Sequence, residues 1–383
     1  MIWTLLGAAN LLLLLLATAQ LARGRRLLPW LRDMPLPPAD AALPLLTVIA
    51  PARNEARHIE AAVRALCAQE YPDLEVIVVD DRSTDATPRL LAELQRELPR
   101  LQVLTLQTLP PGWLGKNNAN ARAAERARGE LLLFTDADVI LAPGALRRAV
   151  GMLQRERLDM LAVGPEAPMP GLLLPQFALY FALLFSLFTR PWAARDPRSR
   201  AHVGIGAFNL VRASVYRAAG GHERIRLRPD DDLKLGKIIK LAGGAQAFAV
   251  GRGAVRVEWY GSWRELRDGL MKNLFAGAEY RVWLVLLGVL SHLLLLVLPP
   301  FALAWTTGLG WWCYAACCAL FVLQGIAAAP SLGTARWAGL LLPGLALFGA
   351  YLMIRATAVT LWRGGIEWRG SRYALADLRA NRV

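Results

Sequence analysis

The stretch Leu74-Glu-Val-Ile-Val-Val-Asp80-Asp81 decides the fold that this sequence predicts. A short apolar run rich in β-branched residues is typical of a buried strand, and this one stops at two adjacent carboxylates. Three further strand-like runs lie at 46–50, 101–106 and 130–135. The last of them also stops at carboxylates, in Asp136-Ala-Asp138. The sequence therefore predicts four strands, two of which end at acidic pairs.

Helical patterns separate these strands. Residues 58–69 carry apolar side chains at helical spacing, and 118–128 are rich in Ala and Arg. Thr87-Pro88 supplies an N-cap and a first-turn proline for a helix between them. This alternation predicts an α/β fold with a mostly parallel, Rossmann-like sheet covered by helices. Ligands bind such sheets at the carboxyl ends of the strands.

Composition argues against a disordered chain and against a wholly soluble enzyme. The chain has 383 residues, 44 Lys+Arg against 30 Asp+Glu, 55% hydrophobic residues and a mean hydropathy of +0.33. Its four cysteines are too few for a disulfide framework. Cys313, Cys317 and Cys318 lie in an apolar run without nearby His or acidic residues, so we expect buried small side chains there and no metal site.

Four apolar runs reach the roughly 20 residues that cross a bilayer: 2–22, 282–305, 309–329 and 337–362. The first could be a signal peptide, but its positive charges, Arg23, Arg25 and Arg26, follow the run, which favours an uncleaved anchor. Gly171–Phe188 is apolar but broken by Pro175 and Gln176. We expect that helix to lie in the membrane interface or to pack on the core.

The basic residues pose a topological conflict. If those after the anchor are cytoplasmic, three further spans place the tail outside. The tail nevertheless holds five arginines, which the positive-inside rule places inside: Arg363, Arg369, Arg372, Arg379 and Arg382. Either one C-terminal run is re-entrant or the tail departs from the rule, and the sequence leaves both open.

Asp136 and Asp138 are candidate metal ligands. Two carboxylates one residue apart in a turn can face one hard cation, Mg²⁺ or Mn²⁺, whose remaining ligands come from phosphates. Aspartates are also common in turns for structural reasons. The second acidic pair, Asp80-Asp81, strengthens the functional interpretation, because converging carboxylates need a cation or hydrogen-bond donors to hold them.

Two further segments have both a structural and a chemical interpretation. Lys116 lies just before the helix at 118–128, where it could meet a phosphate or simply be solvated. Asp230-Asp231-Asp232 follows Pro229 and precedes a helical pattern. Acids stabilise a helix N-terminus, but one of them could also be a general base that takes the proton of an acceptor hydroxyl.

Taken together, these residues resemble the family-2 glycosyltransferases of GT-A fold from about Leu46 to Tyr280. The most specific motifs are Val48-Ile-Ala-Pro-Ala-Arg-Asn-Glu55, Tyr71-Pro72 and Val78-Val-Asp-Asp-Arg-Ser-Thr-Asp-Ala-Thr87. The resemblance implies a divalent cation, Mg²⁺ or Mn²⁺, on Asp138 and Asp136. It also implies nucleotide-sugar binding by Pro51, Arg53, Asn54, Glu55, Asp80, Asp81, Lys116 and Asp136.

The same resemblance assigns the acceptor side and the base. Gly206-Ala-Phe208-Asn209 matches the acceptor-side segment of the family. Asp231-Asp232 matches its catalytic Glu-Asp pair, with Asp in place of Glu, which makes Asp232 the base and Asp231 its catalytic neighbour. Because three aspartates follow one another, this register is uncertain by one residue.

The membrane runs resemble those of the branch that acts on lipids: ceramide, hopanoid-associated and carotenoid glycosyltransferases. The resemblance implies inverting transfer of a hexose from a nucleotide sugar, such as a UDP-sugar, to a hydroxyl of a membrane lipid. The alternatives are a processive polysaccharide synthase, whose Gln-x-x-Arg-Trp motif is absent here, and an inactive nucleotide-sugar-binding subunit. We expect no nucleic-acid partner, because the arginines are dispersed and suit lipid headgroups and diphosphate.

The expected organisation places the catalytic domain on the cytoplasmic side of the inner cell membrane, in a multi-pass protein. The segments are a 1–26 anchor, a 27–44 linker, a 45–281 GT-A domain that includes the apolar helix at 171–190, C-terminal spans at 282–362, and a basic tail at 363–383.

Overall fold

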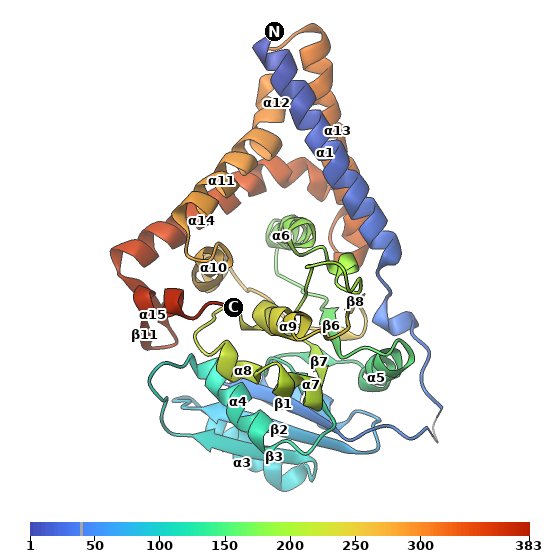
Figure 1. Ribbon diagram of the computed structural model, residues 1–383, viewed down its shortest axis with the longest axis vertical. Coiled ribbons are helices and arrows are strands. Elements are labelled where there is room, and N and C mark those ends of the chain that lie inside the picture. The colour runs from blue at the N-terminus through green and yellow to red at the C-terminus, as the bar shows by residue number, and fades with distance from the viewer. Residues whose placement is uncertain (39–40) are drawn as a thin grey trace. The chain divides into compact units, whose positions relative to one another are not determined.

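The computed structural model describes residues 1–38 and 41–383, and these form two compact units (Figure 1). We call them the sheet unit, which comprises Leu28–Ala167, Arg190–Glu258 and Ala380–Val383, and the apolar unit, which comprises Met1–Leu27, Pro168–Thr189 and Trp259–Arg379. The fifth apolar run therefore groups with the apolar unit. The domain boundaries expected at 45 and 281 stay a proposal.

A seven-stranded sheet with the order β3-β2-β1-β4-β7-β6-β8 forms the sheet unit. β1 pairs in parallel with β2 and β4, whereas β7 runs antiparallel to both of its neighbours, β4 and β6. The predicted mostly parallel α/β fold is confirmed. The strands are β1 (Leu46–Ala52), β2 (Leu74–Asp81), β3 (Leu101–Leu106), β4 (Leu131–Phe134), β6 (Met160–Gly164), β7 (Asn209–Arg212) and β8 (Gln246–Val250), with a separate pair β5 (Ile140–Leu141) and β9 (Val255–Arg256).

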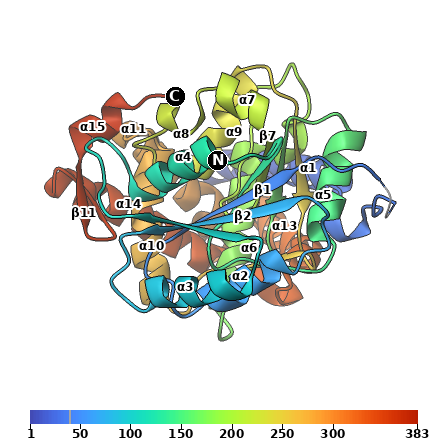
Figure 2. The ribbon, with the colours of Figure 1, turned by 90° about the horizontal axis from the view of Figure 1, so that it is seen from below.

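Helices cover both faces of this sheet. Figure 2 shows α2 and α3 on one face and α4 and α8 on the other. All eight residues of β2 are buried, because its alternating side chains enter two separate cores, Val76 and Val78 in one and Ile77 and Val79 in the other. The helices are α2 (Ile59–Cys67), α3 (Thr87–Glu97), α4 (Gly115–Arg126), α5 (Ala145–Arg155), α7 (Ala213–Ala218), α8 (Gly221–Arg224) and α9 (Asp231–Leu241), with 3-10 turns at Leu31–Asp33 and Pro191–Ala193.

The helix predicted at Thr87 is present, but the predicted cap is wrong. Ala86 occupies the N-cap position and has no capping side chain, while Asp85 Oδ1 accepts from the Thr87 N–H (2.9 Å). The Thr87 hydroxyl instead accepts a hydrogen bond from the backbone N–H of Glu55 (2.9 Å). The Thr87 hydroxyl therefore links the segment after β2 to the loop after β1.

Four helices in the described part of the chain are long and apolar enough to cross a membrane. They are Ile2–Leu27, Val282–Ala302, Gly308–Leu332 and Arg336–Trp362, and they correspond to the four predicted runs. The elements of the apolar unit are α1 (Ile2–Leu27), α6 (Leu174–Thr189), α10 (Trp263–Gly277), α11 (Val282–His292), a π-helical segment (Leu293–Val297), α12 (Leu298–Ala302), α13 (Gly308–Leu332), a 3-10 segment (Arg336–Leu341), α14 (Leu342–Trp362), the hairpin β10 (Gly365–Trp368) and β11 (Ser371–Ala374), and α15 (Leu375–Ala380).

Candidate active site

Lys116 lies at the centre of the site, in the first turn of α4. Its Nζ lies 2.6 Å from Asp136 Oδ1 and 3.6 Å from Asp231 Oδ2. Burial lowers the pKa of this ammonium group, but the carboxylates of Asp136, Asp231 and Asp232 outweigh that effect and raise its pKa. Lys116 is therefore a fixed positive charge that joins the end of β4 to the start of α9.

Asp232 is held by backbone groups. The N–H of Gly206 donates to Asp232 Oδ2 and the N–H of Leu233 donates to Asp232 Oδ1, both at 2.8 Å. A β-carbon on Gly206 would lie 2.9 Å from Asp136 Oδ2 and 3.6 Å from Asp232 Oδ2. The missing side chain therefore lets these two carboxylates approach the same point.

The environment of Asp232 suits a proton acceptor. Burial and the adjacent Asp231 carboxylate raise the pKa of Asp232 to about 6, although Lys116 opposes them. A general base works best when its pKa lies near the working pH, because it is then deprotonated and still basic. The geometry and the pKa of Asp232 both fit that role.

Asp138 is a half-buried carboxylate beside other carboxylates. Burial, Asp136 and Glu55 raise its pKa to about 7. Such crowding favours a bound cation, which would stabilise the ionised form. The described residues contain no group of three or more His, Cys, Asp or Glu side chains that could hold a metal ion. Asp136 and Asp138 stay the candidate ligands, because Mg²⁺ needs only one or two carboxylates and takes its other ligands from phosphate and water.

The residues expected to hold the nucleotide form two interlocked loops. Asn54, in the left-handed region at φ 57°, donates its N–H to Ser83 Oγ (3.0 Å), and its Oδ1 accepts from the N–H of Thr84 (2.8 Å). Asp80 Oδ1 accepts from the Ser83 N–H (3.2 Å). The loops after β1 and β2 are therefore fixed to each other.

Asp81 lies against the start of α4. It accepts two hydrogen bonds from Arg82, at 2.8 and 3.0 Å, and lies 3.8 Å from Arg53 Nη1. A β-carbon on Gly115, the first residue of α4, would collide with the Asp81 carboxylate. Pro51 lies within β1, one position before its last residue. The carboxyl ends of β1 and β2 thus form a polar surface beside Lys116, and Arg53 and Arg82 contribute positive charge to it.

The segment expected on the acceptor side divides into two roles. Gly206 and Asn209 both line a small cavity beside Lys116 and Asp232. Asn209 also accepts a hydrogen bond from the Ile205 N–H through Oδ1 (2.9 Å). Phe208 is fully buried in the hydrophobic core. We therefore assign Phe208 to packing and keep Gly206 and Asn209 as candidates that face the cavity.

Asp230 occupies the N-cap position of α9, as expected, but its side chain does not cap the helix. It forms a buried bidentate pair with Arg228, with both N–O distances at 2.9 Å, and lies 3.7 Å from Lys234 Nζ. The guanidinium group offers Asp230 two parallel hydrogen bonds, which are stronger than one bond to a backbone N–H.

A buried polar cluster around His222 was missed from the sequence. His222 Nδ1 lies 2.8 Å from the Tyr216 hydroxyl, and Nε2 lies 3.3 Å from Asn120 Nδ2. Burial and Lys116 lower the pKa of His222 to about 3, so this ring is neutral at physiological pH. The sequence feature that could have indicated this cluster is the run of asparagines at the start of the predicted helix, Asn117-Asn118-Ala-Asn120, since amides are uncommon in buried helices.

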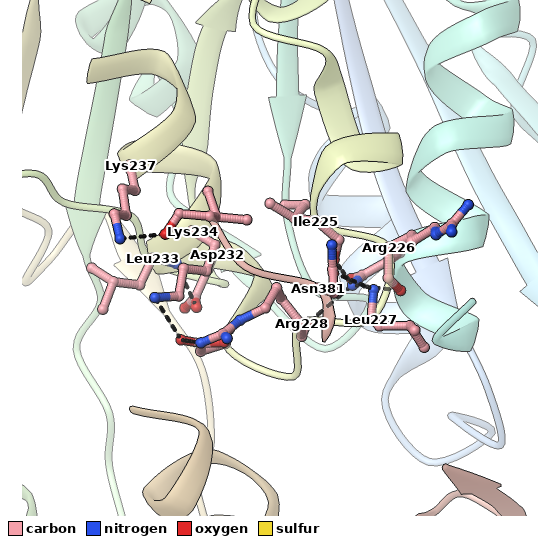
Figure 3. Close-up of polar contacts among 12 residues, drawn as sticks. Ile225, Arg226, Leu227, Arg228, Asp232, Leu233, Lys234, Lys237 and Asn381 are labelled. Atoms are coloured by element: carbon pink, nitrogen blue, oxygen red, sulfur yellow. Dashed lines mark hydrogen bonds and ion pairs between the residues drawn. The ribbon is translucent and has the colours of Figure 1, made fainter. Parts of the chain in front are cut away.

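Two asparagines fix the loop that precedes α9, and neither was predicted. Asn117 Nδ2 donates to the carbonyls of Ile225 (2.9 Å) and Arg228 (3.0 Å). Asn381 Oδ1 accepts from the Leu227 N–H (2.9 Å), as Figure 3 shows. The loop that leads to the three aspartates is therefore held from α4 and from the C-terminal tail.

This mostly parallel sheet, with acidic residues at its strand ends, is typical of the GT-A fold. Residues 47–218 match the family described as Glycosyl transferase family 2. The chain therefore carries a family-2 glycosyltransferase domain, as the sequence motifs predicted. Asp232 lies beyond the matched residues, so its role does not follow from that match.

Similar curated proteins include lipid glycosyltransferases. The chain is 36% identical over 126 residues to beta-monoglucosyldiacylglycerol synthase of Nostoc, a match that covers 32% of this chain and 26% of that protein. It is 35% identical over 104 residues to GalNAc(5)-diNAcBac-PP-undecaprenol beta-1,3-glucosyltransferase of Campylobacter jejuni, which covers 27% of this chain and 33% of that protein. The chain thus spans about a quarter to a third of these relatives.

Among solved structures, a mannosyltransferase from Pyrobaculum calidifontis in complex with GDP-Man and Mn²⁺ is similar over 94% of this chain and 99% of that one. The TM-score is 0.56 and the sequence identity is 20%. This likeness confirms the fold class.

Proposed function

We propose that this protein transfers a hexose, with inversion, from a nucleotide sugar such as a UDP-sugar to a hydroxyl of a membrane lipid. The observation that carries the proposal is the position of Asp232, a carboxylate with a pKa of about 6 in the first turn of α9, beside Lys116 and Asp136. The lipid glycosyltransferases among the similar proteins and the four candidate spans support a lipid acceptor.

Asp232 would act on the acceptor in this reaction. As the acceptor oxygen attacks the anomeric carbon from the face opposite the diphosphate, its proton passes to the Asp232 carboxylate. The bond between that carbon and the diphosphate oxygen breaks, and the nucleotide leaves with the electron pair. Gly206 and Leu233 fix the carboxylate through their N–H groups, so that it is oriented before the acceptor arrives.

Lys116 and the loops after β1 and β2 would hold the donor. The ammonium group of Lys116 can bind the diphosphate, and Asp80, Asp81, Arg53 and Asn54 would hold the base and ribose. Asp138, with Asp136, would hold Mg²⁺ or Mn²⁺, and a bound cation supplies positive charge for the diphosphate as it leaves.

The proposed location is the inner cell membrane, with the catalytic domain in the cytoplasm. Arg23, Arg25 and Arg26 follow the first candidate span, where the positive-inside rule expects cytoplasmic residues. The proposed partners are a nucleotide sugar, a lipid and the bilayer.

The test uses the detergent-solubilised full chain, a membrane lipid extract and four labelled donors: UDP-glucose, UDP-galactose, UDP-GlcNAc and GDP-mannose. We expect one donor to label a lipid and Asp232→Asn to abolish this labelling. Asp73 is exposed and distant in sequence from Asp232, so Asp73→Asn should leave the labelling intact. Label in a high-molecular-mass polymer would point to a polysaccharide synthase. Nucleotide binding without transfer to any lipid would point to a binding subunit.

A further inference from the structure

The last four residues of the tail, Ala380–Val383, are part of the sheet unit. Asn381 Nδ2 donates to the Arg224 carbonyl (3.1 Å), and Asn381 Oδ1 accepts from the Leu227 N–H (2.9 Å). Lys237 Nζ donates to the Val383 carbonyl (2.5 Å), and the Val383 side chain packs against a core cluster. These contacts fix residues 380–383 to the loop and helix that carry Asp230–Asp232.

This attachment restricts how often the chain can cross a bilayer. The chain leaves the sheet unit after Glu258 and returns to it at Ala380. A folded α/β body with a charged surface stays on one side of a membrane, since charged groups and open loops are not stable in hydrocarbon. The segment 259–379 must therefore cross an even number of times, although it contains three helices long and apolar enough to span.

Three of the four candidate helices share one end. The ring of Trp3 in α1 lies 5.7 Å from that of Trp305, which follows α12, and the Tyr314 hydroxyl in α13 donates to the Trp3 carbonyl (3.3 Å). Trp311 and Trp312 lie at the start of α13. Tryptophans gathered in this way are typical of one membrane interface.

The lengths of these helices agree with that interface. From Trp3 to Arg23, α1 covers about 30 Å, which is the thickness of the hydrocarbon layer. α13 offers a similar length from Trp312 to Leu332. Figure 1 shows α1 and α13 side by side along their length. α1, α11–α12 and α13 thus form a set of three crossing segments.

α14 has different surroundings. It packs mainly on α10, whose residues include Arg264, Arg267, Asp268 and Lys272, and also on α11, on the Leu293–Val297 segment and on α6. Phe348 of α14 lies 5.1 Å from Trp263 of α10 and 5.8 Å from Phe177 of α6, measured between ring centroids. In Figure 1, α14 runs crosswise to α1 and α13.

Charge and exposure on α14 also differ from those of a crossing helix. The buried Nε of Arg355 has no hydrogen-bond partner in the described part of the chain, and an arginine in the hydrocarbon centre costs about 2.5–3.5 kcal/mol on insertion scales. Four exposed apolar side chains recur every three to seven residues along one face, Leu347, Tyr351, Ile354 and Leu361, and the exposed Trp362 ends the helix. One apolar face opposite a packed one is typical of a helix that lies in the membrane surface.

We propose that α14 does not cross the bilayer but lies in its surface, on the side of the sheet unit, so that the chain crosses three times. The arginines of the tail then lie on the same side as Arg23, Arg25 and Arg26. This topology removes the conflict with the positive-inside rule, because one of the three C-terminal runs does not cross.

The test is cysteine labelling of the full chain in sealed vesicles of known orientation. The four native cysteines are first replaced, and single cysteines are introduced as Gln95→Cys in the sheet unit, Thr307→Cys between α12 and α13, and Arg369→Cys between β10 and β11, all exposed positions. We expect a membrane-impermeant maleimide to reach Gln95→Cys and Arg369→Cys from one side and Thr307→Cys from the other.

Labelling of Arg369→Cys from the side of Thr307→Cys would overturn the proposal, as would labelling of all three from one side. Size-exclusion profiles that match the parent chain control for folding. A nitroxide on Ile354→Cys gives a second measurement. It should report a depth of about 5–10 Å, whereas one on Leu13→Cys in α1 should lie near the bilayer centre. Equal depths would contradict a surface helix. Neither readout depends on transferase activity.

Discussion

The sheet unit has two clusters of aspartates, and the aspartates of the two clusters have different partners. In Asp136-Ala-Asp138, after β4, the Asp136 carboxylate binds Lys116, and the pKa of Asp138 is raised by burial and by the neighbouring carboxylates. In Asp230–Asp232, at the start of α9, each carboxylate has its own partner. Arg228 binds Asp230, Lys116 lies near Asp231, and backbone N–H groups hold Asp232.

This difference teaches that partners, and not the residue type, decide the role of an aspartate. A carboxylate with a bidentate guanidinium partner is a structural ion pair. One held by N–H groups in a buried site can accept a proton, and one crowded by carboxylates suits a cation. The predictions below test these assignments.

The largest expected effect is that of Asp138→Ala. Loss of the main candidate cation ligand should lower turnover by several orders of magnitude, because the leaving diphosphate loses its counter-charge. Mn²⁺ binding in the presence of nucleotide, followed by electron paramagnetic resonance, should weaken in parallel. Full turnover of the parent protein in excess EDTA would refute the metal assignment.

Asp232→Asn should lower turnover by about 10²–10⁴, the usual effect of removing a general base. Nucleotide titration should show nearly unchanged donor binding, because in the proposed mechanism Asp232 acts on the acceptor and not on the donor. Asp231→Asn is the matched control and should cost less. If Asp231→Asn abolishes turnover while Asp232→Asn preserves it, the register of the base is wrong by one residue.

Asp230 should act on stability. Arg228→Met leaves the buried Asp230 carboxylate without its main partner and should cost about 3–5 kcal/mol in the free energy of unfolding, measured by circular dichroism in detergent. Asp230→Asn should also destabilise. The double variant Arg228→Met/Asp230→Leu should recover much of the loss, and an additive loss would argue against a coupled pair.

The pH profile should follow Asp232. Its pKa is raised to about 6, and the deprotonated form is the base, so kcat/KM should fall about tenfold per pH unit below pH 6 and level off above it. Because stability can also change with pH, the protein incubated at each pH should regain its full rate when it is returned to pH 7.5. The residual activity of Asp232→Asn should lack this limb.

Asn381→Ala should have the smallest effect. It removes two hydrogen bonds to the loop before α9, each worth about 0.5–1.5 kcal/mol. We expect turnover to fall a few-fold and the amides of residues 224–228 to exchange hydrogen faster. Arg382→Ala, next along the tail, is the control and should leave both unchanged.

Much of the sheet could be predicted from the sequence. The four predicted strands correspond to β1, β2, β3 and β4. β1, β2 and β4 read as continuous apolar runs because both of their faces are covered, whereas β3 lies at the edge of the sheet and exposes Gln102 and Thr105. β7 was not predicted, since its four residues Asn209–Arg212 carry no distinct pattern and gain strand structure by pairing between β4 and β6.

The sequence by itself determined the fold class, the candidate spans and the acidic residues of the site, because apolar periodicity and strand-end motifs are local properties of the chain. Only the tertiary structure decided which partner each carboxylate received. It also showed that His222 and Asn117 lie beside the site and that the tail returns to the sheet unit. Those contacts join residues about 100 or more positions apart, and no local pattern encodes them, since long-range packing selects the pairs.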